Sequence, residues 1–180
     1  NLNIIKIQEY YEDGQLKKER DFKKDSQVIW YSNGQKESEA NYKDGEKDGR
    51  YIEYYADGQK RLEANYKDGE KDGRYISYYP NGQKRLEANY IDGKVLGRST
   101  EYYENGQKKL EYIGDKSIEY YENGQKKLEM SIDNTLISDD VCLYGPYIEY
   151  YLEGQLKVKA NYKNCALHGR YVSYYPNGQK

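Results

Sequence analysis

The sequence predicts an all-β fold: an elongated antiparallel β-meander of about eight hairpins with a thin, tyrosine-rich core. The first observation is self-similarity, because residues 50–73 (RYIEYYADGQKRLEANYKDGEKDG) are followed by a near-copy at 74–97 (RYISYYPNGQKRLEANYIDGKVLG). Self-similarity at a period of 20–50 residues is typical of repeat arrays. We therefore predict one array over residues 1–180, with copies centred on Gly14, Gly34, Gly58, Gly82, Gly106, Gly124, Gly154 and Gly178.

The second observation is the composition. Hydrophobic residues make up 36% of the 180 residues, and 25 residues are tyrosines. A compact domain of this length needs a sizeable aliphatic core, so the core should be thin and built largely from tyrosine. Disorder is not expected, because disordered chains are poor in aromatic and β-branched residues.

Each copy contains two predicted strands, such as residues 50–55 and 60–66, in which apolar and polar residues alternate. The connection Ala56-Asp57-Gly58 suits a three-residue hairpin loop, in which glycine adopts the left-handed conformation. With Tyr55 opposite Gln59, the predicted pairs are Tyr54–Lys60, Glu53–Arg61 and Ile52–Leu62. A two-residue loop is rejected, because it would shift the register by one residue and set Glu53 opposite Leu62.

One segment departs from the repeat. Residues 131–143 carry sequence that no other copy shares, including Asp139 and Asp140. Loops that depart from a scaffold often carry binding residues, so these two aspartates are candidates for an interaction surface. Neutral drift in a tolerant turn is the alternative.

The tyrosines are the other candidate for an interaction surface. Tyrosine combines an apolar ring with a polar tip. Side chains on the charge-bearing face should be partly exposed, namely Tyr51, Tyr75, Tyr103 and Tyr121. The alternative is that tyrosines of one face stack on each other as the core.

Charge and motifs argue against several functions. The chain has 29 basic and 31 acidic residues that alternate within each copy, whereas nucleic-acid binding needs a basic stripe. The DGEKDG segments at 44–49 and 68–73 lack the glutamate that closes an EF-hand loop, and His168 occupies a turn position. We predict no catalytic residue, cofactor, metal site or small-molecule substrate.

Cys142 and Cys165 are predicted to be free thiols. The repeat pattern puts them on corresponding edges of successive copies, ~10 Å apart, beyond the ~7 Å limit for disulfide-linked Cα atoms. A bridge would require the long segment before Cys142 to fold over.

The copies resemble the bacterial variant of the MORN repeat, a family that includes the YwqK-like antitoxins. The residues that carry the resemblance are Gly69 and Gly73, Tyr54, Tyr55, Gly58 and Gln59, and Glu63 and Tyr66. The resemblance implies a bacterial, non-enzymatic scaffold that binds another protein, such as a toxin. Attachment to a phospholipid membrane surface or to cell-surface glycans is the alternative.

The compartment stays open at this point. The sequence starts at Asn1 and stops inside a copy, so both ends are expected to be trimmed. A cytoplasmic location and an exported, cell-envelope location are both compatible with the sequence.

Overall fold

The computed structural model describes residues 5–132 and 142–180, and the described residues form β-strands and turns without a helix. The chain forms two compact units, Asn1–Leu96 and Gly97–Lys180. The all-β fold class is confirmed. The prediction of a single array over residues 1–180 stays a prediction.

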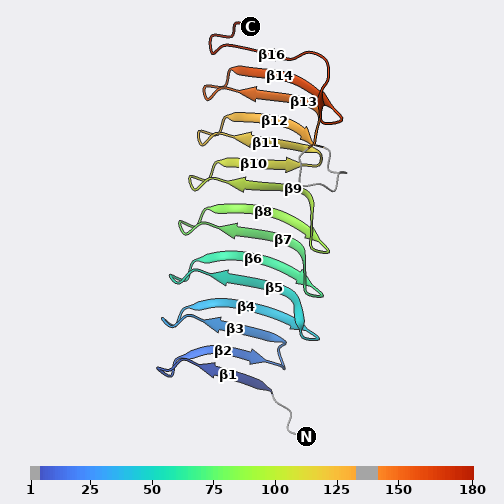
Figure 1. The fold of residues 1–180 in the computed structure, drawn as a ribbon. Coiled ribbons are helices and arrows are strands. Elements are labelled where there is room, and N and C mark those ends of the chain that lie inside the picture. Colours follow the sequence, from blue (N-terminus) through green and yellow to red (C-terminus); the bar gives the residue numbers. More distant parts are fainter. Residues whose placement is uncertain (1–4, 133–141) are drawn as a thin grey trace. The chain divides into compact units, whose positions relative to one another are not determined.

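The first unit is an antiparallel meander in which strands β1 to β8 pair in chain order (Figure 1). Hairpin loops around Gly14, Gly34, Gly58 and Gly82 join the strands at one edge, and turns at residues 22–25, 44–45 and 68–69 join them at the other. The strands are β1 (Lys6–Tyr10), β2 (Leu16–Asp21), β3 (Ser26–Trp30), β4 (Lys36–Lys43), β5 (Glu46–Tyr54), β6 (Lys60–Lys67), β7 (Glu70–Tyr78) and β8 (Lys84–Ile91).

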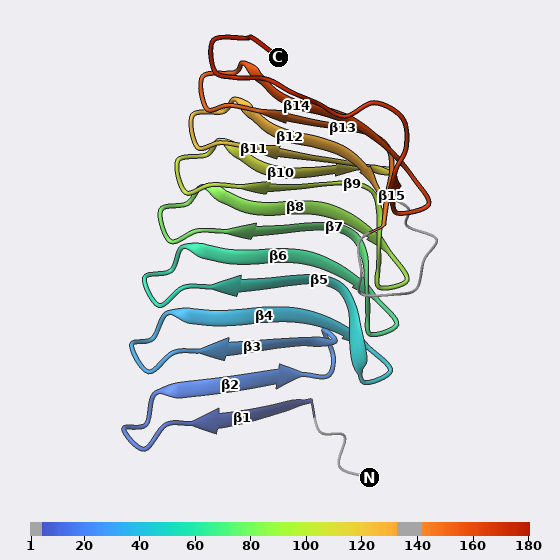
Figure 2. The same cartoon turned by 45° about the horizontal axis from the view of Figure 1, so that its top comes forward.

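The second unit repeats this arrangement, and β9 to β15 pair in chain order (Figure 2). The short strand β16 pairs with β14. The strands are β9 (Lys94–Tyr102), which lies mostly in this unit, β10 (Lys108–Ile113), β11 (Lys116–Tyr120), β12 (Lys126–Ile132), β13 (Leu143–Tyr150), β14 (Leu156–Lys163), β15 (Ala166–Leu167) and β16 (Val172–Ser173). Seven copies thus form complete hairpins, and the eighth contributes β15, β16 and the loop around Gly178.

The three-residue hairpin loop is confirmed. The Tyr55 amide donates to the Gln59 carbonyl at 2.8 Å, and the Gly58 amide donates to the Tyr55 carbonyl at 2.9 Å. Gly58 has a φ of 87°, a left-handed conformation that glycine adopts without steric cost. The loop therefore fixes Tyr54 opposite Lys60 as predicted.

Beyond that first pair the predicted register is wrong. The register shifts at a β-bulge between Glu53 and Tyr54, so that Glu53 pairs with Leu62 and Ile52 pairs with Glu63. The same shift recurs in the hairpins of both units. The bulge inserts Arg61 as an extra residue on β6, and one extra residue moves all following side chains to the other face.

The charge pair that motivated the predicted register nevertheless forms. Arg61 lies in the bulge, and its guanidinium contacts the Glu53 carboxylate at 2.5 Å. In the second unit, Lys127 contacts Glu119 at 3.0 Å and Lys157 contacts Glu149 at 2.6 Å. The ion pairs thus arise from the bulge rather than from direct cross-strand pairing.

The register divides the side chains between two faces. One carries Tyr51, Glu53, Leu62 and Ala64 and their equivalents, and we call it the tyrosine face. The other carries Arg50, Ile52, Glu63 and Asn65 and their equivalents, and we call it the glutamate face.

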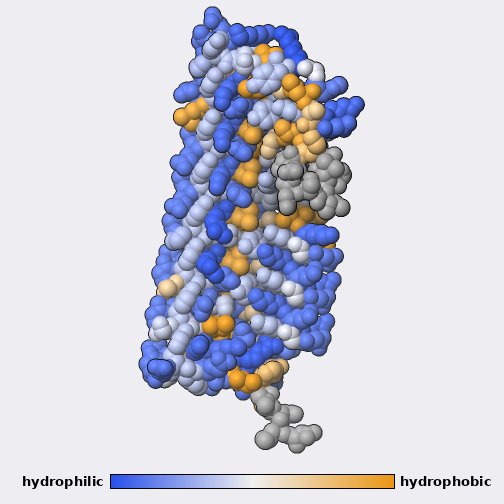
Figure 3. Space-filling model, in the orientation of Figure 1, coloured by the Kyte–Doolittle hydropathy of each residue, from blue (hydrophilic) through white to orange (hydrophobic). Residues whose placement is uncertain are grey.

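The core is thin on both faces. Ile52 and Ile76 are buried on the glutamate face, and Ala64 and Ala88 are buried on the tyrosine face. Figure 3 shows apolar side chains as separate spots between hydrophilic ones. The buried apolar groups are therefore few and small, which agrees with the predicted thin core.

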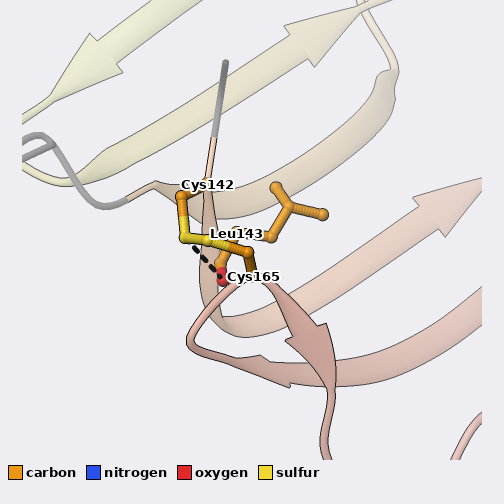
Figure 4. The surroundings of a disulfide bond; sticks show 3 residues. All are labelled: Cys142, Leu143 and Cys165. Carbon is orange, nitrogen blue, oxygen red and sulfur yellow. Dashed lines mark hydrogen bonds between the residues drawn. A yellow bond between two sulfur atoms is a disulfide. The ribbon is translucent and has the colours of Figure 1, made fainter. Parts of the chain in front are cut away.

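The prediction of free thiols is wrong, because Cys142 and Cys165 form a disulfide (Figure 4). Their Cα atoms are 4.7 Å apart. Cys142 directly precedes β13 and Cys165 lies in the turn that follows β14, so the two residues belong to neighbouring strands of one hairpin. Their separation is therefore one strand spacing of ~4.8 Å, not the two spacings assumed from the sequence.

Candidate interaction surface

Lysine side chains stack on tyrosine rings on the tyrosine face of the first unit. The Lys47 Nζ atom lies 3.6 Å from the ring centroid of Tyr51 and 5.1 Å from that of Tyr66. The two rings meet edge to face, with centroids 5.6 Å apart. Ammonium groups at such distances are attracted by the ring quadrupole. We call each such group a lysine–tyrosine stack.

The next copy repeats the stack. Lys71 lies 4.4 Å from the ring centroid of Tyr75 and 5.0 Å from that of Tyr90, and the two rings are 5.5 Å apart. The strand register assembles each stack, because Gly73 pairs with Tyr90 and Tyr75 pairs with Ala88. The small Ala88 side chain leaves room for the ring beside it.

Burial and hydrogen bonding shift the pKa values of the tyrosine and lysine side chains in the two stacks. Burial, together with the hydrogen bond that the Tyr51 hydroxyl donates to the Glu53 carboxylate at 2.5 Å, raises the pKa of Tyr51 well above its ordinary value of 10.0. Burial also raises the pKa of Tyr66 and of Tyr75. Burial lowers the pKa of Lys47. At neutral pH these phenols are therefore uncharged hydrogen-bond donors.

A different set of tyrosines links one copy to the next. The Tyr55 hydroxyl donates to the Tyr78 carbonyl at 2.7 Å. In the second unit, Tyr103 donates to the Tyr120 carbonyl at 2.9 Å and Tyr121 donates to the Tyr150 carbonyl at 3.0 Å. Each of these residues is the second tyrosine of a Tyr-Tyr pair, and its hydroxyl donates to a backbone carbonyl of the neighbouring hairpin.

The four tyrosines proposed as one surface thus occupy two different positions in the repeat. All four are half-buried. Tyr51 and Tyr75 belong to the lysine–tyrosine stacks, whereas Tyr103 and Tyr121 hydrogen-bond between copies. Asp139 and Asp140 lie outside the described residues.

On the glutamate face, three repeat carboxylates contact cations of two strands, namely Glu63, Glu87 and Glu111. Glu63 contacts Lys60 at 2.5 Å and Arg50 at 3.7 Å, and it accepts a hydrogen bond from Tyr78 at 3.4 Å. Lysine and glutamate three residues apart would lie on opposite faces of a regular strand. The bulge between them brings Lys60 and Glu63 to the same face.

The equivalent carboxylate in the second unit is more deeply buried. Only 3% of the Glu111 side chain is exposed, and it contacts Arg98, Lys108 at 3.0 Å and Tyr120 at 3.0 Å. Burial, together with the hydrogen bond to Glu111, raises the pKa of Tyr120 to about 12. This network was not predicted, although the recurrence of lysine three residues before glutamate was a signal for it.

Two hollows open on the glutamate face of the first unit. The larger is about 310 Å³ and is lined by Ser26, Asn41, Arg50 and Ile52, among others. The smaller is about 70 Å³, and Arg50 lines it together with Asn65, Arg74 and Ile76. A glutamate also lines each hollow, Glu39 the larger and Glu63 the smaller, and each glutamate has a lysine partner.

Other site types have little support in the described part of the chain. Over residues 5–132 and 142–180, no three His, Cys, Asp or Glu side chains are placed to hold a metal ion. His168 directly follows β15, and its amide donates to the Asn161 carbonyl at 2.8 Å. Within the same residues, no helix is long and apolar enough to cross a membrane.

Comparison with known proteins gives one family. A model described as "MORN repeat variant" matches the chain eight times, over residues 6–24, 26–44, 47–68, 71–92, 96–113, 116–134, 143–164 and 167–180. Each match contains one of the eight glycines on which the predicted copies are centred. None of the curated proteins matches the chain.

Proposed function

Because the chain belongs to the MORN repeat variant family, we propose that it is a non-enzymatic scaffold that binds another protein through its tyrosine face. The observation that carries this proposal is the pair of lysine–tyrosine stacks in successive copies, Lys47 with Tyr51 and Lys71 with Tyr75. They present rings and charges together at a fixed repeat spacing.

The physical properties of the stacks suit a binding surface. Tyrosine is enriched at the centres of protein interfaces because it contributes a large contact area and a hydrogen bond. Each ring is held by a neighbouring ring and a lysine, so little side-chain entropy is lost when a partner binds. The uncharged phenol of Tyr75 would donate to carbonyl or carboxylate oxygens of that partner.

We further propose a toxin as the partner and a bacterial origin for the chain. This finer proposal is supported only by the resemblance to the YwqK-like antitoxins. An antitoxin of this kind neutralises its toxin by contact, which needs a surface and no reaction.

The disulfide favours an exported location over a cytoplasmic one. Disulfides form and persist in oxidising compartments and are rare in the reducing cytoplasm. Since Cys142 and Cys165 are bonded, we propose that the chain is exported and works in the cell envelope or outside the cell.

The function is tested by capture and direct binding. Oxidised wild-type chain is immobilised, proteins are captured from the native cells, and each captured protein is purified and titrated by calorimetry. We expect Tyr51→Ala/Tyr75→Ala to weaken the binding at least tenfold, since interface hot spots contribute about 2 kcal/mol or more. Tyr144→Ala is the control, because Tyr144 is exposed and lies outside the stacks.

Two results would overturn the proposal. One is that no purified protein binds the wild-type chain, while vesicles of anionic phospholipid or an immobilised glycan do. The other is that Tyr144→Ala weakens binding as much as the double variant.

A further inference from the structure

We propose that the glutamate face of the first unit binds an acidic protein segment in the polyproline II conformation, which lies across β5, β6 and β7. The proposal goes beyond the proposed function, because it concerns the opposite face of the sheet and a partner of defined chemistry. It rests on surplus cations, on the hollows beside them and on the spacing of the repeat.

The first step is the charge balance of the glutamate face. Glu63 has Lys60 at 2.5 Å, so Arg50 at 3.7 Å is a second cation for the same carboxylate. Glu87 likewise has Lys84 at 2.8 Å and Arg74 at 2.9 Å. Each carboxylate therefore keeps a lysine partner when its arginine turns toward a ligand.

The second step is the accessibility of the two arginines. The side chains of Arg50 and Arg74 are 59% and 61% exposed. A guanidinium carries five N–H donors and binds a carboxylate through two parallel hydrogen bonds. Both arginines therefore have donors available for carboxylates of a partner.

The third step is the shape of the surface between them. Arg50 lines both the 310 Å³ hollow and the 70 Å³ hollow. Asn65 lies between the arginines, because it pairs with Arg50 in the register and lines the smaller hollow with Arg74. An extended segment could place its backbone carbonyls against the asparagine amide while its acidic side chains reach the arginines.

The fourth step is the repeat spacing. Arg50 and Arg74 are equivalent residues two strands apart, which corresponds to ~9.6 Å between their backbones at ~4.8 Å per strand. A polyproline II helix has three residues per turn and a rise of ~3.1 Å, so every third side chain recurs on the same side at ~9.3 Å. Acidic residues at every third position therefore match successive arginines.

Other backbone conformations fit less well. In an extended β-strand, side chains three residues apart point to opposite sides, so only one of two such acids would face the sheet. An α-helix is about 10–12 Å across with its side chains, too wide to enter the smaller hollow. Polyproline II also leaves its backbone carbonyls free for partners.

The experiment measures binding of labelled peptides by fluorescence anisotropy at low salt. The probe is a peptide of four Glu-Pro-Pro repeats. We expect Arg50→Ala/Arg74→Ala to bind it at least tenfold more weakly than the wild-type chain. The matched control is Arg61→Ala/Arg85→Ala, which removes the same charge from bulge positions, where Arg61 contacts Glu53 on the tyrosine face; we expect a loss below threefold.

Two further peptides test the spacing and the conformation. A Glu-Pro-Pro-Pro repeat, with its acids one residue further apart, should bind at least fivefold more weakly, and so should a helical peptide with glutamate at every seventh position. Circular dichroism checks that each variant keeps its strand content.

Failure of this proposal is distinguishable from failure of the proposed function. Tyr51→Ala/Tyr75→Ala should bind the Glu-Pro-Pro peptide like the wild-type chain, because its substitutions are on the other face. The proposal is overturned if the wild-type chain does not bind the peptide, if both arginine variants lose binding equally, or if all three peptides bind with equal affinity.

Discussion

Glu111 accepts hydrogen bonds from side chains of three neighbouring strands: Arg98 on β9, Lys108 on its own strand and Tyr120 on β11. A carboxylate with this many donors joins two hairpins through one side chain. In the first unit, Glu63 and Glu87 each contact a lysine and an arginine of their own hairpin. The repeat therefore stabilises its sheet through polar contacts at positions where a compact domain would use aliphatic side chains.

Because of these carboxylates, we expect the free energy of unfolding of the chain to depend on pH. Burial alone would raise the pKa of Glu111, but hydrogen bonds from Lys108, Arg98 and Tyr120 outweigh it and hold the pKa below the ordinary value of 4.5. The Lys60 hydrogen bond lowers the pKa of Glu63, and the Lys84 hydrogen bond lowers that of Glu87. The folded chain thus binds protons less readily than the unfolded chain.

The stabilisation from these groups is complete above pH 4.5 and is lost as the pH falls through the lowered pKa values. Urea unfolding of the wild-type chain should therefore show a midpoint that decreases between pH 5 and pH 3. Glu111→Ala should be about 2 kcal/mol less stable at pH 7, because hydrogen bonds to charged groups contribute about 1.5–3 kcal/mol. Between pH 5 and pH 3, Glu111→Ala should lose less stability than the wild-type chain. An equal loss in both chains would contradict a stabilising role for ionised Glu111.

At the scale of the strands, the loop was predictable and the register beyond it was not. Ala56-Asp57-Gly58 has the composition of one hairpin type, so its length and the Tyr54–Lys60 pair followed from local chemistry. The bulge depends on how Arg61 is placed relative to Glu53, which strand alternation does not reveal. The recurring spacing of Lys60 and Glu63 was the available signal, because side chains three residues apart share a face only when one extra residue lies between them.

The disulfide could also have been derived from the repeat. Cys142 occupies the position of Glu46, and Cys165 occupies that of Gly69. Like Gly69, Cys165 has a positive φ, 64° against 82°. A Cβ atom built on Gly69 would lie 3.8 Å from the Cβ atom of Glu46, and ~3.8 Å is the usual separation in a disulfide. Comparing the copies position by position, rather than counting copies, would have placed the cysteines side by side.

This equivalence predicts that a disulfide can be built into the first unit. Oxidised Glu46→Cys/Gly69→Cys should contain a new bond, seen by mass analysis as a loss of two hydrogens. The bonded residues are as far apart in sequence as Cys142 and Cys165, 23 residues, and a disulfide that closes such a loop stabilises by about 3 kcal/mol. The unfolding midpoint should therefore fall when the new bond is reduced.

The control for the engineered bond is Glu46→Cys/Gly93→Cys, in which the partners come from different copies. Its introduced thiols should stay free under the same oxidation. An engineered pair at 46 and 69 that stays reduced would show that the Glu46–Gly69 contact differs from the one around Cys142.

At the scale of the whole molecule, the repeat explains how a chain poor in aliphatic residues folds. Apart from β16, which pairs with β14, the described strands of each unit pair with their neighbours in chain order, so stability is a sum of local terms. Composition and period were enough to predict this architecture. The division into the units Asn1–Leu96 and Gly97–Lys180 could not be predicted, because the repeat pattern continues through residues 74–97 without a break.

If stability is local, a destabilising substitution in one unit should leave the stability of the other unit nearly unchanged. Ile52 and Ile118 are equivalent buried residues of the first and second units, and Ile→Ala in a core costs about 2–5 kcal/mol. When the free energy of opening falls by about 2.5 kcal/mol, amide exchange becomes roughly 60-fold faster. Hydrogen exchange with mass spectrometry should show this increase for Ile52→Ala in β4, β5 and β6, with less than threefold change in β13 and β14.

Ile118→Ala is the reciprocal variant and should show the opposite pattern, with faster exchange in β10, β11 and β12 and little change in β4 to β6. The reason is that each hairpin receives its hydrogen bonds and its tyrosine contacts from adjacent hairpins, so an opened copy exposes its neighbours first. If both variants accelerated exchange equally throughout residues 5–132 and 142–180, the chain would unfold as one cooperative body. Its stability could then not be a sum of copies.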